Sequence, residues 1–337
     1  MANTPATETS DRGRRLSLTA DKKLAVVDFP IREPGAGEVL IETICSLISA
    51  GTELGTRETQ KDDEVSVGYS NVGRILALGD GARSRGYSEG DVVLSLGIHA
   101  THVVASSEPH ELAPVPENVD PAEAAFAILG SVSMHGVRKA RAELNEHVCV
   151  SGMGLVGQLA LQLLARAGCE SLVALDLVES RLEMALTSGA THGLNVKSGN
   201  LAATIGDITA ACGLDLIVEA SGFPEALLTA FDLARIGGRI MCLGSIWHRK
   251  IGVDFMDFHE KELTLVGCHQ PKCPTSETPY FRWTKQHNRR QALKMIGDGR
   301  LDVKKLISHT MPFEQADQAY RLLQSEQDKA LGVVLSY

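Results

Sequence analysis

Short apolar runs separated by glycine, proline and aspartate follow one another from residue 16 to about residue 119. Runs of this kind, rich in β-branched residues and bounded by turn residues, are typical of β-strands. The pattern predicts a compact, mostly antiparallel β domain with strands at 24–29, 38–48, 73–79, 91–96 and 102–106. Residues 1–15 are polar and aperiodic, so we expect them to be a disordered tail.

The pattern changes at residues 147–176. A short apolar run is followed by three glycines in G-x-G-x-x-G spacing, which are Gly152, Gly154 and Gly157. Apolar residues then recur every three or four positions, and a second apolar run closes on Asp176. A strand, a glycine turn, a helix and a strand ending in an acid make a dinucleotide-binding βαβ unit. The alternative is a glycine-tolerant turn in another kind of parallel sheet.

Each glycine has a separate role in such a unit. Gly152 permits the tight turn, Gly154 has no side chain to hold a diphosphate away from the backbone, and Gly157 lets the helix pack close to the strand. The free N–H groups at the helix start, at Leu155 and Val156, are expected to face the diphosphate.

Asp176 lies 19 residues after Gly157 and can accept hydrogen bonds from both hydroxyls of the adenosine ribose. A carboxylate there favours NAD over NADP, because it repels a 2′-phosphate. Arg181 is also a candidate cofactor contact and could still reach a 2′-phosphate, so it leaves NADP as the alternative.

The rest of the chain continues the parallel-sheet pattern. Apolar runs at 214–221, 238–245 and 262–268 predict further strands, with helices between them. Helical periodicity is also present at 121–142 and 286–299, whereas residues 269–284 are aperiodic. We therefore predict an α/β protein in which a doubly wound parallel sheet lies beside the β domain.

Composition narrows the function classes. The net charge is -9 and there is no basic cluster long enough for a nucleic-acid footprint, so nucleic acid is not an expected partner. No apolar run reaches the ~20 residues needed to span a bilayer. The seven cysteines are odd in number and scattered, and the first residues lack the apolar core of a signal peptide. These features predict a cytoplasmic protein with a small-molecule substrate.

The order of these parts resembles the medium-chain dehydrogenase/reductase superfamily. The matching segments are PGAGEVLIET (34–43), SAGTE (49–53), GYSNVGRILALG (68–79), EGDVV (89–93), PENVDPAEAA (116–125), the glycine turn, VEASG (218–222), GGRIMCLG (237–244) and ISHTMPFEQADQAYRLL (307–323).

The resemblance implies a GroES-like catalytic domain at 16–128 and a Rossmann NAD-binding domain at 129–267. Residues 268–337 would return to the catalytic domain, and the active site would lie in the cleft between the domains. The family commonly forms dimers or tetramers, so a homodimer or homotetramer is expected, with strand addition near 238–245.

The chain departs from the zinc alcohol dehydrogenases of this family. Those enzymes have Cys-Gly-Thr-Asp where this chain has Ala50 to Glu53, and Gly-His-Glu where it has Gly68 to Ser70. The third ligand position falls within 127–130, which contains no Cys, His, Asp or Glu, and the segment expected to hold the structural zinc, 94–106, has no cysteine. Zinc needs three or four protein ligands, so we predict no metal.

Without zinc, a side chain must donate a proton or hydrogen bond to the substrate oxygen. By the resemblance, Tyr69 replaces a zinc ligand in the cleft, and His99 can approach it. Glu53 could orient Tyr69 or bind a substrate hydroxyl, and Ser49 is a weaker polar candidate for the substrate. The alternatives are that Tyr69 fills the space left by zinc, that His99 is structural, and that Glu53 caps a turn.

Other residues are candidates for ligand contacts. The resemblance places the Ser131 hydroxyl against the nicotinamide, although serine also suits a helix cap. Strand ends of the parallel sheet supply further candidate cofactor contacts, namely Ser221, Gly244 and Ser245. After the last of these strands, the loop at 269–284 offers substrate contacts at His269, Gln270 and Trp283, unless it is a plain surface loop.

The leading hypothesis is a zinc-independent NAD(H)-dependent oxidoreductase that interconverts a secondary alcohol and a ketone, on a sugar, cyclitol or natural-product intermediate. One alternative is a zinc-free enoyl or quinone reductase of the same superfamily, which Asp176 disfavours because such enzymes usually prefer NADPH. The other is a catalytically silent dinucleotide-binding protein.

Overall fold

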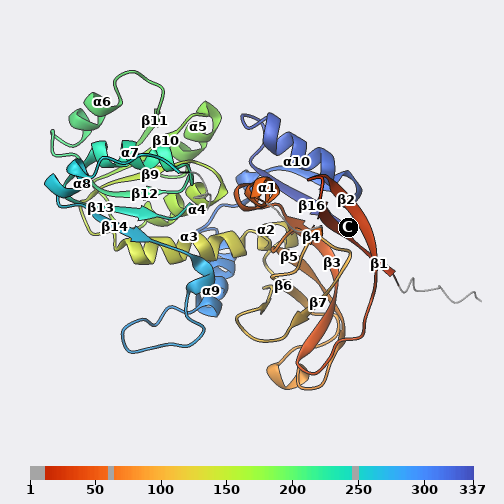
Figure 1. Cartoon of the computed structure of the whole chain (residues 1–337). Coiled ribbons are helices and arrows are strands. Elements are labelled where there is room, and N and C mark those ends of the chain that lie inside the picture. Colours follow the sequence, from red (N-terminus) through yellow and green to blue (C-terminus); the bar gives the residue numbers. More distant parts are fainter. Residues whose placement is uncertain (1–11, 60–63, 245–249) are drawn as a thin grey trace, which may run out of the picture.

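The computed structural model describes residues 12–59, 64–244 and 250–337, which form two lobes (Figure 1). One lobe, here called the β domain, contains strands β1 to β8 and the last segment of the chain. The other, here called the parallel-sheet domain, contains strands β9 to β14. This arrangement confirms the predicted α/β class, with a β domain beside a doubly wound parallel sheet.

The β domain is built on a seven-stranded sheet in the order β15-β16-β3-β5-β6-β8, with β7 also paired to β3. Most of β3 is buried because it lies in the middle of this sheet. The strands are β3 (Glu38–Leu47), β5 (Asn71–Leu78), β6 (Val92–Ser95), β7 (His102–Ser106), β8 (Leu112–Pro114), β15 (Ile307–Pro312) and β16 (Gly332–Ser336). Helices α1 (Ala50–Thr59) and α10 (Ala316–Ser325) pack together beside it.

A second, three-stranded sheet has the order β2-β1-β4, with β1 (Arg12–Thr19), β2 (Leu24–Pro30) and β4 (Glu64–Ser66). The predicted tail is therefore wrong for residues 12–15, which begin β1 and pair with β2. Arg14 and Arg15 form ion pairs of 2.8 and 3.0 Å with Glu314 and Glu64. Local composition hid the start of this strand because its arginines look solvated in the sequence, whereas Arg14 bonds Glu314, 300 residues away.

The parallel-sheet domain has six strands in the order β11-β10-β9-β12-β13-β14, all parallel to their neighbours. The chain moves outward from β9 in both directions, so the strand order reverses next to β9. Ligands bind outside the carboxyl ends of strands at such a point. The strands are β9 (His147–Ser151), β10 (Ser171–Asp176), β11 (His192–Asn195), β12 (Leu214–Glu219), β13 (Ala234–Cys242) and β14 (Thr264–Gly267).

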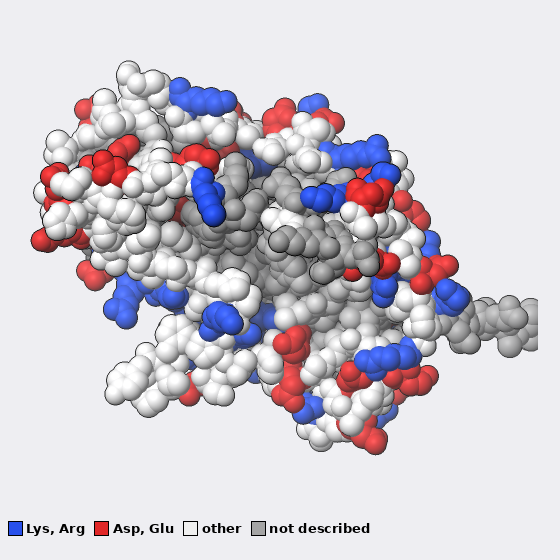
Figure 2. Space-filling model, in the orientation of Figure 1, with Lys and Arg blue, Asp and Glu red and all other residues white. Residues whose placement is uncertain are grey.

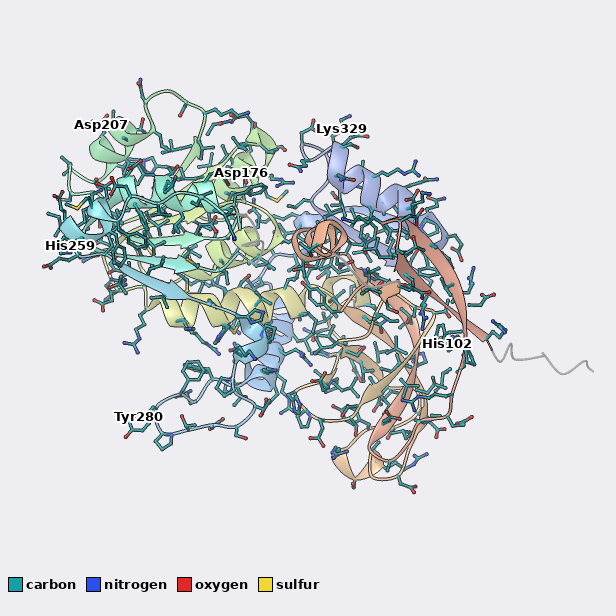
Figure 3. All side chains as sticks on the ribbon, in the orientation of Figure 1. His102, Asp176, Asp207, His259, Tyr280 and Lys329 are labelled. Carbon is teal, nitrogen blue, oxygen red and sulfur yellow. The ribbon has the colours of Figure 1, made fainter. Side chains whose placement is uncertain are left out.

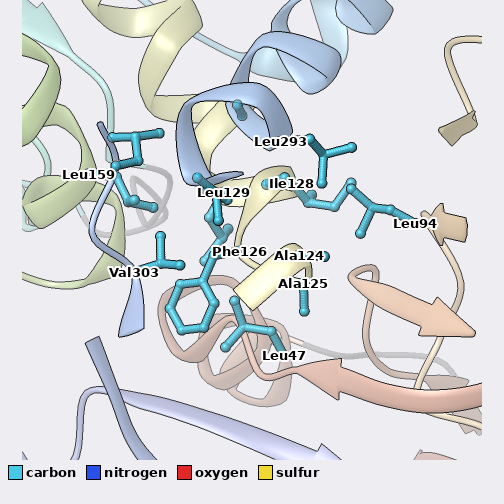
Figure 4. Packing of buried hydrophobic residues seen from close by; sticks show 14 of the residues in the cluster. Leu47, Leu94, Ala124, Ala125, Phe126, Ile128, Leu129, Leu159, Leu293 and Val303 are labelled. Atoms are coloured by element: carbon cyan, nitrogen blue, oxygen red, sulfur yellow. The ribbon is translucent and has the colours of Figure 1, made fainter. Parts of the chain in front are cut away.

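Helices cover this sheet and join it to the β domain. The helices are α2 (Pro121–Ala124), α3 (Ala127–Ala140), α4 (Leu155–Leu164), α5 (Glu179–Thr187), α6 (Leu201–Ile208), α7 (Pro224–Leu233), α8 (Met256–Glu260) and α9 (Lys285–Gly297). One hydrophobic cluster takes Leu47 from β3, Leu129 from α3, Leu159 from α4 and Leu293 from α9 (Figure 4). The two lobes therefore share a hydrophobic core.

Acidic and basic side chains are interspersed on the face shown in Figure 2, with no extended basic patch. Within the described ranges, no helix combines the length and the apolar character that crossing a membrane requires.

Candidate active site

The glycine turn after β9 has the geometry that its sequence predicts. Gly152 has φ +91, in the left-handed region, and a Cβ there would be 2.6 Å from the backbone nitrogen of Ser221. A Cβ on Gly157 would be 1.8 Å from the carbonyl oxygen of Gly152. Only glycine fits either position, because both contacts are with backbone atoms.

Gly154 differs from these two. It precedes α4, which starts at Leu155 and Val156, and a Cβ on Gly154 would meet no heavy atom within 4 Å. The backbone at the helix start is therefore open on the side where a side chain would project. Open space beside free N–H groups at a helix start fits a diphosphate.

Asp176 ends β10 and turns toward the glycine turn. Its carboxylate accepts hydrogen bonds from the backbone N–H groups of Met153 at 2.6 Å, Leu177 at 2.8 Å and Val178 at 2.9 Å. In Figure 3 Asp176 lies on the side of the parallel-sheet domain that faces the β domain. The carboxylate is thus fixed beside the glycine turn.

Arg181, at the start of α5, is directed elsewhere. Its Nη2 donates to the carbonyl oxygen of Ala330 at 3.3 Å, in the segment that returns to the β domain. Burial lowers the pKa of Arg181, and the charge of Asp176 opposes that effect. In this arrangement the guanidinium links the two lobes.

Glu219 is a site residue that the sequence reasoning missed. It is fully buried at the end of β12, and its carboxylate accepts hydrogen bonds from the N–H groups of Ser221 at 2.8 Å and Gly222 at 3.1 Å. Its backbone carbonyl accepts from Leu243 at 2.8 Å and Gly244 at 2.9 Å. Burial raises the pKa of this carboxyl group. Its place in the VEASG segment was the available signal.

Glu219 therefore holds both strand-end turns that were predicted to contact the cofactor. Ser221 also donates its hydroxyl to Glu219, and a Cβ on Gly244 would be 2.3 Å from the nitrogen of Gly222. The third predicted residue there, Ser245, lies outside the described residues.

Ser131 is the fifth residue of α3, so the helix-cap alternative is wrong. It is 1% exposed, and its hydroxyl donates to the carbonyl oxygen of Ile128 at 2.7 Å. The hydroxyl is satisfied inside its own helix.

A buried polar cluster lies in the β domain around Glu53. Glu53 is 4% exposed and His99 is 0% exposed, and Glu53 Oε2 is 3.1 Å from His99 Nε2. Oε2 also accepts a hydrogen bond from the Tyr320 hydroxyl, and Oε1 accepts from the Ser49 N–H at 2.7 Å. Burial acts to raise the pKa of Glu53, but His99 and these donors outweigh it, so the pKa lies below its usual value.

Tyr69 lies beside this cluster and not in it. Its hydroxyl donates to the Ser49 hydroxyl, and Thr52 Oγ1 is 3.4 Å away. Glu53 bonds the Ser49 N–H and Tyr69 bonds the Ser49 hydroxyl, so Ser49 links the two residues, and the orienting of Tyr69 by Glu53 stays a prediction. Burial raises the pKa of the Tyr69 phenol, and the nearby Glu53 charge adds to it.

The structure thus brings together the three predicted catalytic residues and Ser49. The sequence reasoning missed Tyr320, which lies 267 residues from Glu53, because no local pattern connects segments so far apart. His99 lies between β6 and β7, where its approach to this group was expected.

Of the predicted substrate residues in the 269–284 loop, Trp283 lies away from the Tyr69 group. Trp283 is 3.6 Å from the guanidinium carbon of Arg138 and 4.2 Å from that of Arg282, measured to the ring centroid. It lines a hollow of about 630 Å³ beside β13 and β14, and no residue of the Tyr69 group lines that hollow. His269 is exposed and Gln270 half-buried, just after β14. In Figure 3 Tyr280 lies at the outer end of this loop, which projects from the rest of the molecule.

A protein metal site needs several ligand side chains close together. In the described part of the chain, no three His, Cys, Asp or Glu side chains are grouped so that they could hold a metal ion. The resemblance places zinc-ligand positions at Ala50 and Tyr69, neither of which offers a usual zinc donor.

Comparison with known proteins adds independent information. A family model described as zinc-binding dehydrogenase matches residues 156–286. D-guloside 3-dehydrogenase of Escherichia coli is 25% identical, covering 91% of this chain and 95% of that protein. Erythritol/L-threitol dehydrogenase of Mycolicibacterium smegmatis is 26% identical, covering 90% of this chain and 92% of that protein.

A solved alcohol dehydrogenase of Escherichia coli CFT073, in complex with NADH, superimposes with a TM-score of 0.82. Its sequence identity is 20%, and the match covers 97% of this chain and all of that chain, 100%. At this identity the likeness shows a shared fold.

Proposed function

Because this chain belongs to the medium-chain dehydrogenase/reductase superfamily and is an alcohol-dehydrogenase-like oxidoreductase, we propose that it interconverts a secondary alcohol and a ketone without zinc. Its cofactor is a nicotinamide dinucleotide, and we propose that NAD(H) is the preferred form. The nicotinamide, when bound, accepts or supplies the hydride.

The observation that carries this proposal is the hydroxyl of Tyr69. It lies at a position that holds a zinc ligand in zinc alcohol dehydrogenases, and its partner is the Ser49 hydroxyl. A zinc ion would stabilise an alkoxide as a Lewis acid. Tyr69 offers a hydrogen-bond donor in its place.

The electrostatics support the donor role. Burial raises the pKa of Tyr69, so the phenol keeps its proton at neutral pH and can donate to a substrate oxygen. Glu53 and His99 lie directly behind Ser49, and they are the titratable groups that we propose exchange a proton with that site.

Asp176 supports the choice of NAD(H). Its carboxylate is fixed by three backbone N–H groups, two on Oδ1 and one on Oδ2, so Oδ2 retains an acceptor site for a ribose hydroxyl. The Arg181 guanidinium, which would be needed for a 2′-phosphate, is bonded to the Ala330 carbonyl.

The substrate class is inferred from the relatives. The names of the two curated relatives refer to a guloside and to four-carbon polyols. We therefore propose a polyhydroxylated substrate such as a sugar, sugar alcohol or cyclitol. Ser49, with a hydroxyl beside Tyr69, is the proposed contact for one substrate hydroxyl, and His269 and Gln270 remain proposed contacts beyond β14.

We also propose that two copies associate through β14. The sequence suggested strand addition near 238–245, but β13 is paired on both sides, so within this sheet the free edge on that side is β14. Leu265 on β14 is 42% exposed, which suits a covered edge better than a solvated one.

The direct test removes the Tyr69 hydroxyl. Tyr69→Phe should lower kcat for oxidation of an active polyol by about 10²–10⁴-fold, the usual contribution of a positioned proton donor. The affinity for NADH should stay unchanged, because the cofactor residues lie in the other lobe. Tyr87→Phe is the matched control, since the Tyr87 hydroxyl donates to the Leu112 carbonyl within the β domain at 3.1 Å.

Two results would contradict the proposal. Near-wild-type kcat in Tyr69→Phe would mean that another group donates to the substrate. No hydride transfer to NAD or NADP from a panel of sugars, polyols and cyclitols would contradict the alcohol–ketone assignment itself.

A further inference from the structure

The cluster behind Tyr69 continues through the β domain as a chain of hydrogen bonds. His99 Nε2 is 3.1 Å from Glu53 Oε2, and His99 Nδ1 is 2.7 Å from the Ser46 hydroxyl. The Ser46 hydroxyl is 3.0 Å from the Tyr337 hydroxyl. Neither Ser46 nor Tyr337 has a place in the cofactor or substrate contacts described above.

The inner members of this chain are sealed from solvent. His99 and Ser46 are both 0% exposed, whereas Tyr337 is 36% exposed. Tyr337 lines a hollow of about 390 Å³ together with Thr43, Thr101 and His102. His102, labelled in Figure 3, lies on the side of the β domain away from the parallel-sheet domain. The chain therefore runs from the candidate active site to the opposite side of the β domain.

When His99 is a neutral imidazole, the hydrogens along the chain have one consistent direction. An ionised Glu53 can only accept, so His99 Nε2–H donates to it. The neutral imidazole then accepts at Nδ1, which takes the single hydroxyl hydrogen of Ser46. Ser46 has no second hydrogen, so the Tyr337 hydroxyl must donate to Ser46. Each hydrogen thus points inward, from Tyr337 toward Glu53.

We propose that Tyr337, Ser46 and His99 form a path that delivers protons from the outer hollow to Glu53, an inference that rests on the proposed ketone–alcohol chemistry for its use. Ketone reduction adds a hydride to the carbonyl carbon and one proton to the oxygen. The path brings that proton from water in the hollow to Glu53, and in the same proposal Glu53 passes it to the substrate oxygen through the hydroxyls of Ser49 and Tyr69.

The transfer balances at every atom. Tyr337 takes a proton from water and gives its own to Ser46, and Ser46 gives its own to His99 Nδ1. His99 then gives its Nε2 proton to Glu53, which becomes a neutral carboxyl group beside Ser49 and Tyr69. One proton leaves the water and one arrives at Glu53, with no change in oxidation state. Ser46 and Tyr337 are positioning residues, because neither touches the substrate.

The test measures proton exchange and does not depend on turnover. The protein is labelled with ¹⁵N-histidine, and the His99 N–H signal is identified among the 11 histidines by its loss in His99→Gln. Its exchange with water is then compared in Ser46→Ala, Tyr337→Phe and the double variant. Ser336→Ala is the control, because that neighbouring hydroxyl bonds the Met311 carbonyl at 3.4 Å and is outside the chain.

We expect Ser46→Ala and Tyr337→Phe each to slow exchange by about 10²-fold, the lower end of the contribution of a positioned proton-transfer group. The double variant should be no slower than the slower single variant, because both residues act in series. A substitution that merely loosened the fold would instead speed the exchange of the His99 N–H, because local opening exposes this group to water. Unchanged or faster exchange in either single variant would overturn the path.

A separate measurement tests whether the path is used in catalysis. Ser46→Ala and Tyr337→Phe should lower kcat for ketone reduction and raise its solvent deuterium isotope effect, while NADH affinity stays the same. Slowed exchange with unchanged kcat would overturn the catalytic use. If the wild-type protein reduces no ketone, the proposed function fails, and the exchange measurement still decides whether the path exists.

Discussion

Gly154→Ala separates a structural role of the glycine turn from a binding role. Gly154 has φ -69 and ψ -176, which any residue can adopt. An added Cβ meets no heavy atom within 4 Å, so the folded chain has room for the methyl group. The variant is therefore expected to fold normally.

Two small effects on stability oppose each other in this variant. Alanine restricts the unfolded chain, which stabilises the protein by about 0.4–1 kcal/mol. Alanine is also a poorer residue than glycine in front of a helix, at a cost of roughly 0.5–1 kcal/mol. The free energy of unfolding should stay within about 0.5 kcal/mol of the wild-type value.

The effect on cofactor binding should be much larger. The methyl group occupies the open space at the start of α4, where we propose that the cofactor diphosphate lies. Losing one hydrogen bond to a charged group removes about 1.5–3 kcal/mol. Since about 1.4 kcal/mol is a tenfold change in affinity, the Kd for NADH should rise by at least about tenfold.

Gly157→Ala and Gly206→Ala are the two comparisons. The Gly157 methyl would be 1.8 Å from the Gly152 carbonyl oxygen, so this variant should lose about 3 kcal/mol or more of stability. Gly206 lies in α6 with no heavy atom within 4 Å, so Gly206→Ala should gain about 1 kcal/mol and keep its NADH affinity.

Urea unfolding and a fluorescence titration with NADH measure the two quantities on the same samples. Wild-type NADH affinity in Gly154→Ala would refute the placement of the diphosphate at this turn. A loss of about 2 kcal/mol in its unfolding free energy would refute the open space that the structure gives it.

Three further outcomes are expected. Titration should show NADH binding more tightly than NADPH, because the Asp176 carboxylate repels a 2′-phosphate; the reverse order would count against the assignment. Elemental analysis should find no zinc, and chelator should leave activity intact; one zinc per chain would contradict this. The pKa of Glu53 is lowered in the fold, so its stabilising effect is present above the unfolded value of about 4.3 and is lost as pH falls through the folded value. In Glu53→Gln the free energy of unfolding should therefore fall less steeply as the pH is lowered. An unchanged pH dependence would refute this reasoning.

Local pattern was enough for the dinucleotide unit. Three glycines at fixed spacing, a helical period and an acid at a strand end are all short-range signals, and the structure places Gly152, Gly157 and Asp176 as those signals imply. The pattern did not reveal that Glu219 holds the neighbouring turns, since its importance comes from burial and from five hydrogen bonds made after folding.

One error came from interpreting polar composition as exposure to solvent. Arg12 to Arg15 were expected in a tail, yet they form part of β1, where pairing with β2 satisfies the backbone. Trp283 was expected near the substrate because its loop is rich in donors, and this stays a prediction; in the structure Trp283 stacks against Arg138 and lines a hollow beside β13 and β14. Polar composition shows which side chains can form hydrogen bonds. Where those side chains lie depends on how the segment packs in the fold.

The polar cluster of the β domain is held together by contacts that no local sequence pattern predicts. A buried carboxylate is stable only when donors or an opposite charge compensate its lost hydration. Glu53 receives them from Ser49, His99 and Tyr320, which lie at the start of α1, between β6 and β7, and on α10. Three segments that the sequence separates are thereby tied together behind Tyr69. Through these bonds the carboxylate fixes the position of Ser49, whose hydroxyl accepts the hydrogen bond of Tyr69.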